Sequence, residues 1–362
     1  MESITEVPPL REVVAHAWFT MGYPPSRSLV LVEMTALGDG DAPGFVARID
    51  LPPPRYRRQA AEVLAIAARR NEVEAALVLV VLDPVPSGRP LTPHRMRRLV
   101  RDLRSVLRRA GVSVLDVVLV DAGRHRSLLC EDAACCPPEG QELGDVSATR
   151  TAAAMVLRGR ALVEDESALV ADVAPDPWPA ELLRSQAPHD DGDGDDLLAR
   201  WQALVAARMA EDGAVADPTP DQVAWLVPAM RDRNLRDALL VSLLPGGVRL
   251  ARRFARGQIL GVPDLGAAEA RRPDPALFAA GRALLAAVAR GAPAGSRAEA
   301  LALLAWMGWW QNDGVRARLL AAMALREHPG HRLAGLVDTL LLHGVPPAWL
   351  VAAGSAPEPR PG

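Results

Sequence analysis

A change in the spacing of apolar residues, next to an acidic segment rich in proline and glycine, constrains this chain more than any other feature. Before that segment, short apolar runs typical of strands alternate with helical patterns, and after it every periodic segment has helical spacing. The segment covers residues 174–196 and ends in a run of aspartates and glycines, a composition typical of linkers. We therefore predict an α/β domain at 1–173, an acidic Pro/Gly linker at 174–196, an α-helical domain at 197–352 and a disordered tail at 353–362.

The first domain has the element order of a sheet covered by helices. The run 75–82 is apolar throughout, which is typical of a strand buried on both faces, and the largely apolar run 115–121 is expected to be another buried strand. Strand–helix–strand order favours parallel pairs joined by right-handed crossovers. The expected fold is α/β, a mixed and largely parallel sheet with helices on both faces. The predicted strands are 28–34, 44–50, 75–82, 115–121 and 125–129, and the predicted helices are 10–19, 58–70 and 92–110.

The second domain is expected to be α-helical and repeat-like. Residues 298–329 resemble one helical hairpin of the tetratricopeptide type, with alanines at its small positions and a turn at Asn312. Trp306, Trp309 and Trp310 form an aromatic stripe in this hairpin. Such a stripe is typical of a helical core or of a groove that binds a peptide, so we expect a protein or peptide partner to bind at the helical domain.

The charged residues exclude several functions. All 41 basic residues are arginine, so the chain has no lysine for a P-loop, a kinase-type phosphate site or a Schiff base. The formal net charge is -3. This balance argues against a surface that binds polyanions, and we predict no nucleic-acid partner.

The sequence also predicts a cytoplasmic protein with no membrane partner. Glu2 and Glu6 stand where a signal peptide carries basic residues. The most apolar segment, 301–310, is too short to span a bilayer. In a reducing cytoplasm, clustered cysteines are more often thiols or metal ligands than a structural disulfide.

Every cysteine of the chain lies in one short stretch, at Cys130, Cys135 and Cys136. Thiolates and imidazole are preferred zinc ligands, so these cysteines and His125 form the candidate metal site. Against zinc, the spacing lacks a paired C-x2-C, and the odd offset from His125 to Cys130 places them on opposite faces of a strand. The alternatives are a redox pair and a structural loop whose cysteines pack inward beneath the two prolines that follow. We favour packing.

Three aspartates form a second candidate site. Asp50, Asp83 and Asp121 each end a strand that is expected to run parallel to the others. Because ligands bind beyond the carboxyl ends of such strands, these carboxylates could hold Mg²⁺ or act as acid and base. Aspartate is also an ordinary residue of turns, and we favour that interpretation. The short strand at 125–129 is expected to leave the cysteine loop near the same edge.

Several stretches of the chain resemble the actinobacterial family called domain of unknown function 4192. The most specific is the double-cysteine motif, SLLCEDAACCPPEG at 127–140. Family members usually carry aromatic residues just before the serine of this motif, where this chain has His125 and Arg126. The resemblance implies a domain that extends over nearly the whole chain, and it implies no particular activity. The other matching stretches are 21–32, 46–52, 115–121, 236–240 and 317–341.

The sequence lacks the motifs of several common enzyme sites. It has no G-x-G-x-x-G after a strand, no G-x-x-x-x-G-K, no G-x-S-x-G and no H-E-x-x-H. His328 and His331 fall at a helix–helix turn and are predicted to be solvated rather than ligands. We therefore predict a non-catalytic protein that binds a partner or a small ligand. The alternative is a metal-assisted hydrolase that uses the carboxylates at the strand ends. The sequence indicates no oligomeric state.

Overall fold

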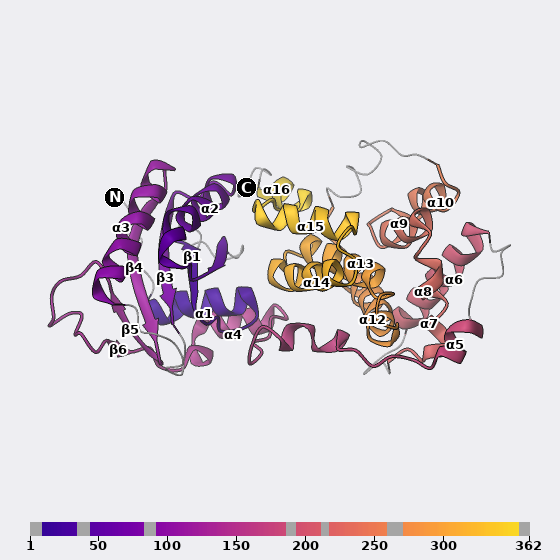
Figure 1. Ribbon diagram of the computed structural model, residues 1–362, viewed down its shortest axis with the longest axis horizontal. Coiled ribbons are helices and arrows are strands. Elements are labelled where there is room, and N and C mark those ends of the chain that lie inside the picture. Colours follow the sequence, from indigo (N-terminus) through magenta and orange to yellow (C-terminus); the bar gives the residue numbers. More distant parts are fainter. Residues whose placement is uncertain are drawn as a thin grey trace, which may run out of the picture. The chain divides into compact units, whose positions relative to one another are not determined.

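The chain divides into two compact units, and both are discontinuous in sequence. Unit 1 comprises residues 1–169 and 343–345, and unit 2 comprises residues 170–342 and 346–362. In the computed structural model shown in Figure 1, the described residues are 9–34, 44–82, 92–185, 193–210, 217–258 and 271–354.

Unit 1 contains a six-stranded sheet with the strand order β2-β1-β3-β4-β5-β6. Four of the strands match the predicted ranges to within a few residues, and the fifth, β5, is shorter than predicted. The sixth, β6, is a two-residue strand that the apolar pattern does not indicate, because both of its residues are exposed. The strands are β1 (Ser28–Glu33), β2 (Val46–Asp50), β3 (Ala75–Val81), β4 (Ser113–Asp121), β5 (Arg124–Ser127) and β6 (Gln141–Glu142).

The prediction of a largely parallel sheet is wrong. β1 is antiparallel to both β2 and β3, and β5 is antiparallel to both β4 and β6. Among the described strands, β3 and β4 form the one parallel pair. The reason for the error is that a continuous apolar run reports burial on both faces of a strand and carries no information about its direction.

Helices account for that burial. On one face, α2 (Arg57–Arg70) and α3 (Pro93–Arg109) share an apolar core with Leu29, Leu31, Val78 and Val80 of the sheet. The alternate strand residues Val30, Val32, Leu77 and Leu79 are also buried. α1 (Leu10–Met21) packs against β1 and β2 and also against α4 (Arg150–Leu157). Short 3-10 turns lie at Pro54–Tyr56, Val146–Ala148 and Ala168–Val173.

The ends of α3 follow from local sequence. Pro93 occupies its first turn, where a missing backbone N–H costs no hydrogen bond. Gly111, with φ of 86°, follows its last residues in the left-handed conformation that glycine adopts without strain. The prediction of a basic amphipathic helix at 92–110 is confirmed to within one residue at each end.

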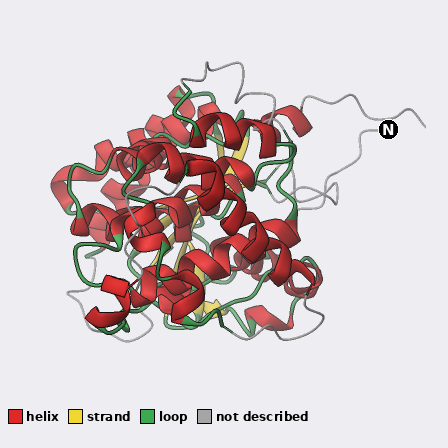
Figure 2. Cartoon of the chain, turned by 90° about the vertical axis from the view of Figure 1, so that its right-hand side faces the viewer, coloured by secondary structure: helices red, strands yellow, loops and turns green. Residues whose placement is uncertain are grey.

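The regular elements in the described part of unit 2 are all helices, and helices predominate in the cartoon of Figure 2. Its core includes the fully buried Trp201, Phe278 and Trp310. The helices are α5 (Ala180–Ser185), α6 (Gly194–Ala210), α7 (Pro220–Val223), α8 (Leu226–Ala229), α9 (Arg233–Ser242), α10 (Val248–Ala255), α12 (Pro275–Gly291), α13 (Ala298–Trp310), α14 (Gly314–Glu327), α15 (Arg332–Leu342) and α16 (Ala348–Gly354).

The aromatic stripe of the predicted hairpin lies largely in this core. α13 and α14 form the hairpin and pack closely against each other. Trp306 and Trp310 are 6% and 0% exposed, and the Trp310 ring lies 5.1 Å from the ring of Phe278. Only Trp309 is half-buried. Core packing, the first of the two interpretations, therefore describes Trp306 and Trp310.

Part of the predicted linker is structured. The backbone N–H groups of Asp176 and Trp178 donate to the carbonyls of Arg290 and Gly291, at the end of α12. The ring of Trp178 lies so close to Gly291 that a Cβ at this position would overlap it. α5 also falls within 174–196, whereas residues 186–192 lie outside the described ranges, as does most of the predicted tail. Over the described ranges, no helix is both long and apolar enough to cross a bilayer.

Candidate functional site

The cysteine loop leaves β5 through a set of hydrogen bonds centred on Ser127. The hydroxyl of Ser127 donates to Asp116 Oδ1 on β4 at 2.8 Å. The same hydroxyl accepts the backbone N–H groups of Leu129 and Cys130, at 3.1 and 3.0 Å. Because β4 lies in the middle of the sheet, this arrangement fixes the first cysteine of the loop to a rigid element.

A single turn at Asp132 places the other two cysteines. The Asp132 carboxylate accepts the N–H of Ala134 at 2.8 Å, and the Asp132 carbonyl accepts the N–H of Cys136 at 2.7 Å. This is the hydrogen-bond pattern of one helical turn with an aspartate cap. The turn curls the chain so that Cys135 and Cys136 lie close to Cys130.

The loop returns to the sheet through a second turn, Pro137 to Gly140. Gly140 has φ of 75°, and a Cβ on it would lie 2.8 Å from the carbonyl oxygen of His125, so only glycine fits. The Arg124 guanidinium donates to the carbonyls of Glu139 and Gly140, at 2.9 and 2.6 Å. The Gln141 side chain donates to the carbonyl of Cys135 at 2.7 Å. Polar contacts therefore hold both ends of the loop and its centre.

These turns bring the three sulfur atoms together. All three lie within 4.8 Å of one another, and the sulfurs of Cys135 and Cys136 are 3.9 Å apart. The favoured interpretation of inward packing is wrong, because Cys135 is exposed and Cys130 and Cys136 are only half-buried. Adjacent cysteines point the same way here because the Asp132 turn replaces the extended backbone that would separate them.

Proximity of the thiols changes their acidity. The neighbouring thiol of Cys136, and after it that of Cys130, raises the pKa of Cys135 to about 11. The largest cause is the hydrogen bond between the thiols of Cys135 and Cys136, followed by the repulsion that a second thiolate would meet in such a small cluster. A bound cation would relieve that repulsion, so the cluster favours either protonated thiols or thiolates that share a metal ion.

His125 does not join the cluster. Among the described residues, the group that could hold a metal ion comprises the three cysteines alone. His125 lies on β5 with its Nδ1 atom buried and without a hydrogen-bond partner, and burial lowers its pKa. The odd offset between His125 and Cys130 argued against a shared site, but its reason does not apply here, because β5 ends at Ser127 and Cys130 lies beyond the strand.

The carboxylates of the second candidate site are far apart. β2, β3 and β4 run in the same direction, so Asp50 and Asp121 do end at one edge of the sheet. The register aligns Asp50 with Val120 across three strand spacings, which separates the two aspartates by roughly 14 Å. Asp50 instead pairs with Arg48 at 2.7 Å, and its side chain is 80% exposed. Asp83 lies outside the described residues.

The cysteine loop does not begin at the edge of the sheet where Asp50 and Asp121 lie. β5 runs back along β4, so that Arg124 pairs with Asp121 and Ser127 pairs with Val118. Three residues of antiparallel strand separate these pairs by about 10 Å. The prediction that the loop lies beside the strand-end carboxylates has no support from this register.

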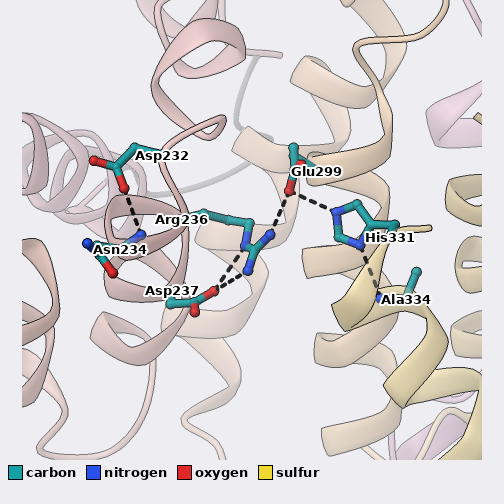
Figure 3. A network of polar contacts seen from close by, with 7 residues as sticks. All are labelled: Asp232, Asn234, Arg236, Asp237, Glu299, His331 and Ala334. Carbon is teal, nitrogen blue, oxygen red and sulfur yellow. Dashed lines mark hydrogen bonds and ion pairs between the residues drawn. The ribbon is translucent and has the colours of Figure 1, made fainter. Parts of the chain in front are cut away.

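A second cluster of ionisable residues lies in unit 2 and joins three helical segments, as Figure 3 shows. Arg236, on α9, donates to Asp237 at 2.7 and 2.9 Å and to Glu299 Oε2, on α13, at 2.9 Å. His331 Nε2 lies 2.8 Å from the same Glu299 oxygen. His331 is 3% exposed, so the prediction of a solvated histidine is wrong at this position.

The hydrogen bonds of His331 determine which of its ring nitrogens carries the proton. Its Nδ1 accepts the backbone N–H of Ala334 at 3.2 Å and so caps the start of α15 (Figure 3). The remaining ring nitrogen, Nε2, therefore carries the proton and donates it to Glu299. Burial opposes ionisation of Glu299, but the hydrogen bonds from His331 and Arg236 outweigh it and lower the pKa of that carboxyl. The polar groups of this cluster satisfy one another, which suits a structural role.

Sequence patterns did not identify Asp116 and Ser127, which hold the start of the cysteine loop, or His331, which caps α15. Asp116 interrupts an otherwise apolar strand, and Ser127 opens the cysteine motif, so both carried a local signal. Their pairing depends on the register of β4 and β5, which a single sequence does not contain. His331 carried the signal of a residue just before a helix, where capping side chains are found.

Comparison with known proteins adds one relationship. The family model described as a domain of unknown function (DUF4192) matches residues 12–348. No curated protein and no solved structure matches the chain.

Proposed function

The chain belongs to the DUF4192 family, whose description assigns no activity, and we propose from its geometry that it is a metal-binding protein. Its cysteine loop binds Zn²⁺ through the thiolates of Cys130, Cys135 and Cys136. The observation that carries this proposal is the convergence of three sulfur atoms within 4.8 Å on a partly exposed loop.

The spacing of the sulfurs suits a zinc ion. Zinc–sulfur bonds of about 2.3 Å in a tetrahedron place ligand sulfurs about 3.8 Å apart. The sulfurs of Cys135 and Cys136 are already 3.9 Å apart, and Cys130 needs only a small movement to reach the same spacing. Zinc would supply a positive charge that stabilises three thiolates together.

The support around the cysteines favours a site over a connecting loop. Ser127, Asp132 and Gln141 fix the backbone at each cysteine, although none of these contacts increases apolar burial. Such prearrangement lowers the entropy that a metal ion must overcome when it orders its ligands. Because the three cysteines are the only members of this cluster among the described residues, a fourth position is left for water or for a group from a partner.

A non-catalytic role is the better fit to these features. The hydrolase alternative needs carboxylates around one ion, and Asp50 and Asp121 lie too far apart for that. The expected protein or peptide partner at the helical unit remains a prediction. Its repeat-like character has support from the α13–α14 hairpin alone.

Metal analysis of the purified, reduced full-length protein tests the proposal. After incubation with Zn²⁺ and removal of the excess, we expect about one zinc ion per chain. Substitution with Co²⁺ should give thiolate-to-metal charge-transfer absorption. Metal affinity should rise with pH, because each thiol, and Cys135 above all, must release a proton to bind.

Two variants distinguish metal binding at the three cysteines from non-specific metal binding elsewhere on the protein. Cys136→Ser removes one ligand and should abolish the cobalt absorption, whereas Glu131→Gln changes an exposed residue of the same loop and should leave it intact. Retention of zinc by Cys136→Ser at the wild-type level would contradict the proposal. A wild-type protein that retains no zinc, and whose thiol count changes reversibly with dithiothreitol, would favour the redox alternative.

A further inference from the structure

The outer surface of α3 is strongly basic. The helix contains seven arginines and one acidic residue, Asp102. Its apolar side chains, including Leu99, Leu103 and Leu107, are buried against the sheet, which leaves the opposite side of the helix in solvent. Six of the arginines are exposed there: Arg97, Arg98, Arg101, Arg104, Arg108 and Arg109.

These six arginines, the α3 arginine face, have no acidic partner in the described part of the chain. None of them takes part in an ion pair or side-chain hydrogen bond of the kind that other arginines of this protein make. Asp102 does not offset their charge, because it pairs with Arg57 of α2 at 3.1 Å. The positive charge of this surface is therefore not neutralised within the described residues.

The arrangement is unfavourable for the isolated protein. Arg97, Arg101, Arg104 and Arg108 follow one another at spacings of three and four residues, so like charges lie side by side on the helix. The helix dipole offsets this repulsion only at Arg108 and Arg109, which lie in the last turn of α3. A bound polyanion would turn these repulsions into attractions.

The dimensions of the face match a nucleic-acid backbone. Arg97 to Arg108 spans about 17 Å along the helix axis. Each strand of B-form DNA carries one phosphate per 3.4 Å of axis, so this length faces about five phosphates of one strand. Guanidinium groups bind phosphate oxygens in bidentate geometry.

An anionic membrane fits the same surface less well. Basic helices that lie on membranes insert an apolar side into the lipid. The apolar side of α3 is occupied by the sheet, and no large apolar side chain of α3 is exposed. The net charge of -3 concerns the chain as a whole and does not describe this surface.

We propose that the α3 arginine face binds the phosphate backbone of a nucleic-acid duplex without regard to base sequence. The proposal opposes the expectation of no nucleic-acid partner, which rested on net charge alone. It is independent of metal binding, because none of its residues belongs to the cysteine loop.

Fluorescence anisotropy with the full-length protein and a 20-base-pair DNA duplex of arbitrary sequence (about two helical turns) tests this. A plot of log affinity against log salt concentration should have a slope between about -3 and -5, since three to six phosphates are contacted. The double variant Arg101→Gln/Arg104→Gln should reduce the slope by about 2 and weaken binding roughly 50-fold at 0.1 M salt.

Arg249→Gln/Arg252→Gln is the matched control. It removes two exposed arginines of α10 that make no ion pair in the described residues, and duplex binding should not change. Equal loss in both double variants would show that total charge, and not this face, governs binding. Should Arg101→Gln/Arg104→Gln fail to fold, as judged by thermal unfolding, Arg97→Gln/Arg108→Gln provides the same comparison.

Vesicles containing phosphatidylserine form the second arm of the experiment. Binding to these vesicles without measurable duplex binding would assign the face to a membrane surface and overturn the proposal. Absence of binding to both, at low salt, would also overturn it.

Discussion

The cysteine loop of unit 1 and the Arg236–Glu299–His331 cluster of unit 2 both gather ionisable side chains, yet they use them in opposite ways. In the unit 2 cluster, each donor has an acceptor within the protein, and the least exposed member, His331, is almost completely buried. In the cysteine loop, the backbone N–H groups of Cys130 and Cys136 and the carbonyl of Cys135 are hydrogen-bonded, while the sulfur atoms face one another at partial exposure.

This difference distinguishes two roles that a cluster of polar side chains can have. Where side chains satisfy each other, the cluster holds helices together and its loss is a loss of stability. Where the backbone is fixed and the side chains retain unused bonding capacity, the cluster is suited to a ligand. The predictions below test whether this division holds, beginning with the largest expected effect.

Cys136→Ser should lower zinc affinity by at least about 1000-fold, which corresponds to about 4 kcal/mol. The reason is that a serine hydroxyl is a poor ligand for zinc and the cluster has no spare cysteine. Competition with a chromophoric chelator measures the change. Thermal unfolding without metal should differ little from wild type, because Cys136 is only half-buried. A large loss of stability without metal would mean that the cysteines pack after all.

Glu299→Ala should destabilise the protein by about 2–3 kcal/mol, because it leaves Arg236 and His331 without their shared acceptor. Urea unfolding measures this value. The matched control is Glu62→Ala, whose partner Arg58 is exposed, and we expect a change of about 0.5 kcal/mol or less. If the two substitutions had equal effects, the Arg236–Glu299–His331 cluster would stabilise the fold no more than an exposed ion pair does.

Ser127→Ala should weaken zinc binding about tenfold, or about 1.4 kcal/mol, while all three cysteines remain. It removes the hydroxyl that links Asp116 to the N–H groups of the loop. Ser105→Ala, on α3, serves as the control and should leave the affinity unchanged. If Ser127→Ala binds zinc like the wild type, the hydrogen bonds of the loop do not prearrange the site.

The smallest effect concerns pH. Because the pKa of Glu299 is lowered in the folded protein, its ionised form stabilises folding above the ordinary value of 4.5, and this contribution disappears as pH falls through the folded value. The stability difference between wild type and Glu299→Gln should therefore shrink between about pH 6 and pH 3. Urea unfolding at several pH values measures it. A difference that stays constant would mean that the carboxylate charge makes no contribution.

How much of this the sequence could predict depends on the range of the interactions involved. Local patterns located β3, β4 and α3, because apolar spacing and a proline cap act within a few residues. Strand direction was not predictable, since it is determined by pairing between segments that are distant in sequence. The apolar run of β3 has the same appearance beside an antiparallel β1 as beside a parallel neighbour.

The cysteine loop shows the same limit at the level of single residues. Its position followed from the clustering of the cysteines in sequence, whereas the separation of His125 from them depends on β5 ending at Ser127. The exposure of Cys135 did not, because it depends on how the Asp132 turn and the Gln141 side chain orient one short segment. For α3, the sequence contained the arginines, but averaging charge over the whole chain concealed their concentration on one surface.

The discontinuity of unit 1 has a consequence for synthesis of the protein. Residues 343–345 belong to unit 1, although roughly 170 residues separate them from Leu169. At typical translation rates, a ribosome needs about 10–35 s to make that intervening stretch. During this time the nascent sheet unit lacks its last three residues, so it can be completed only when most of unit 2 has left the ribosome.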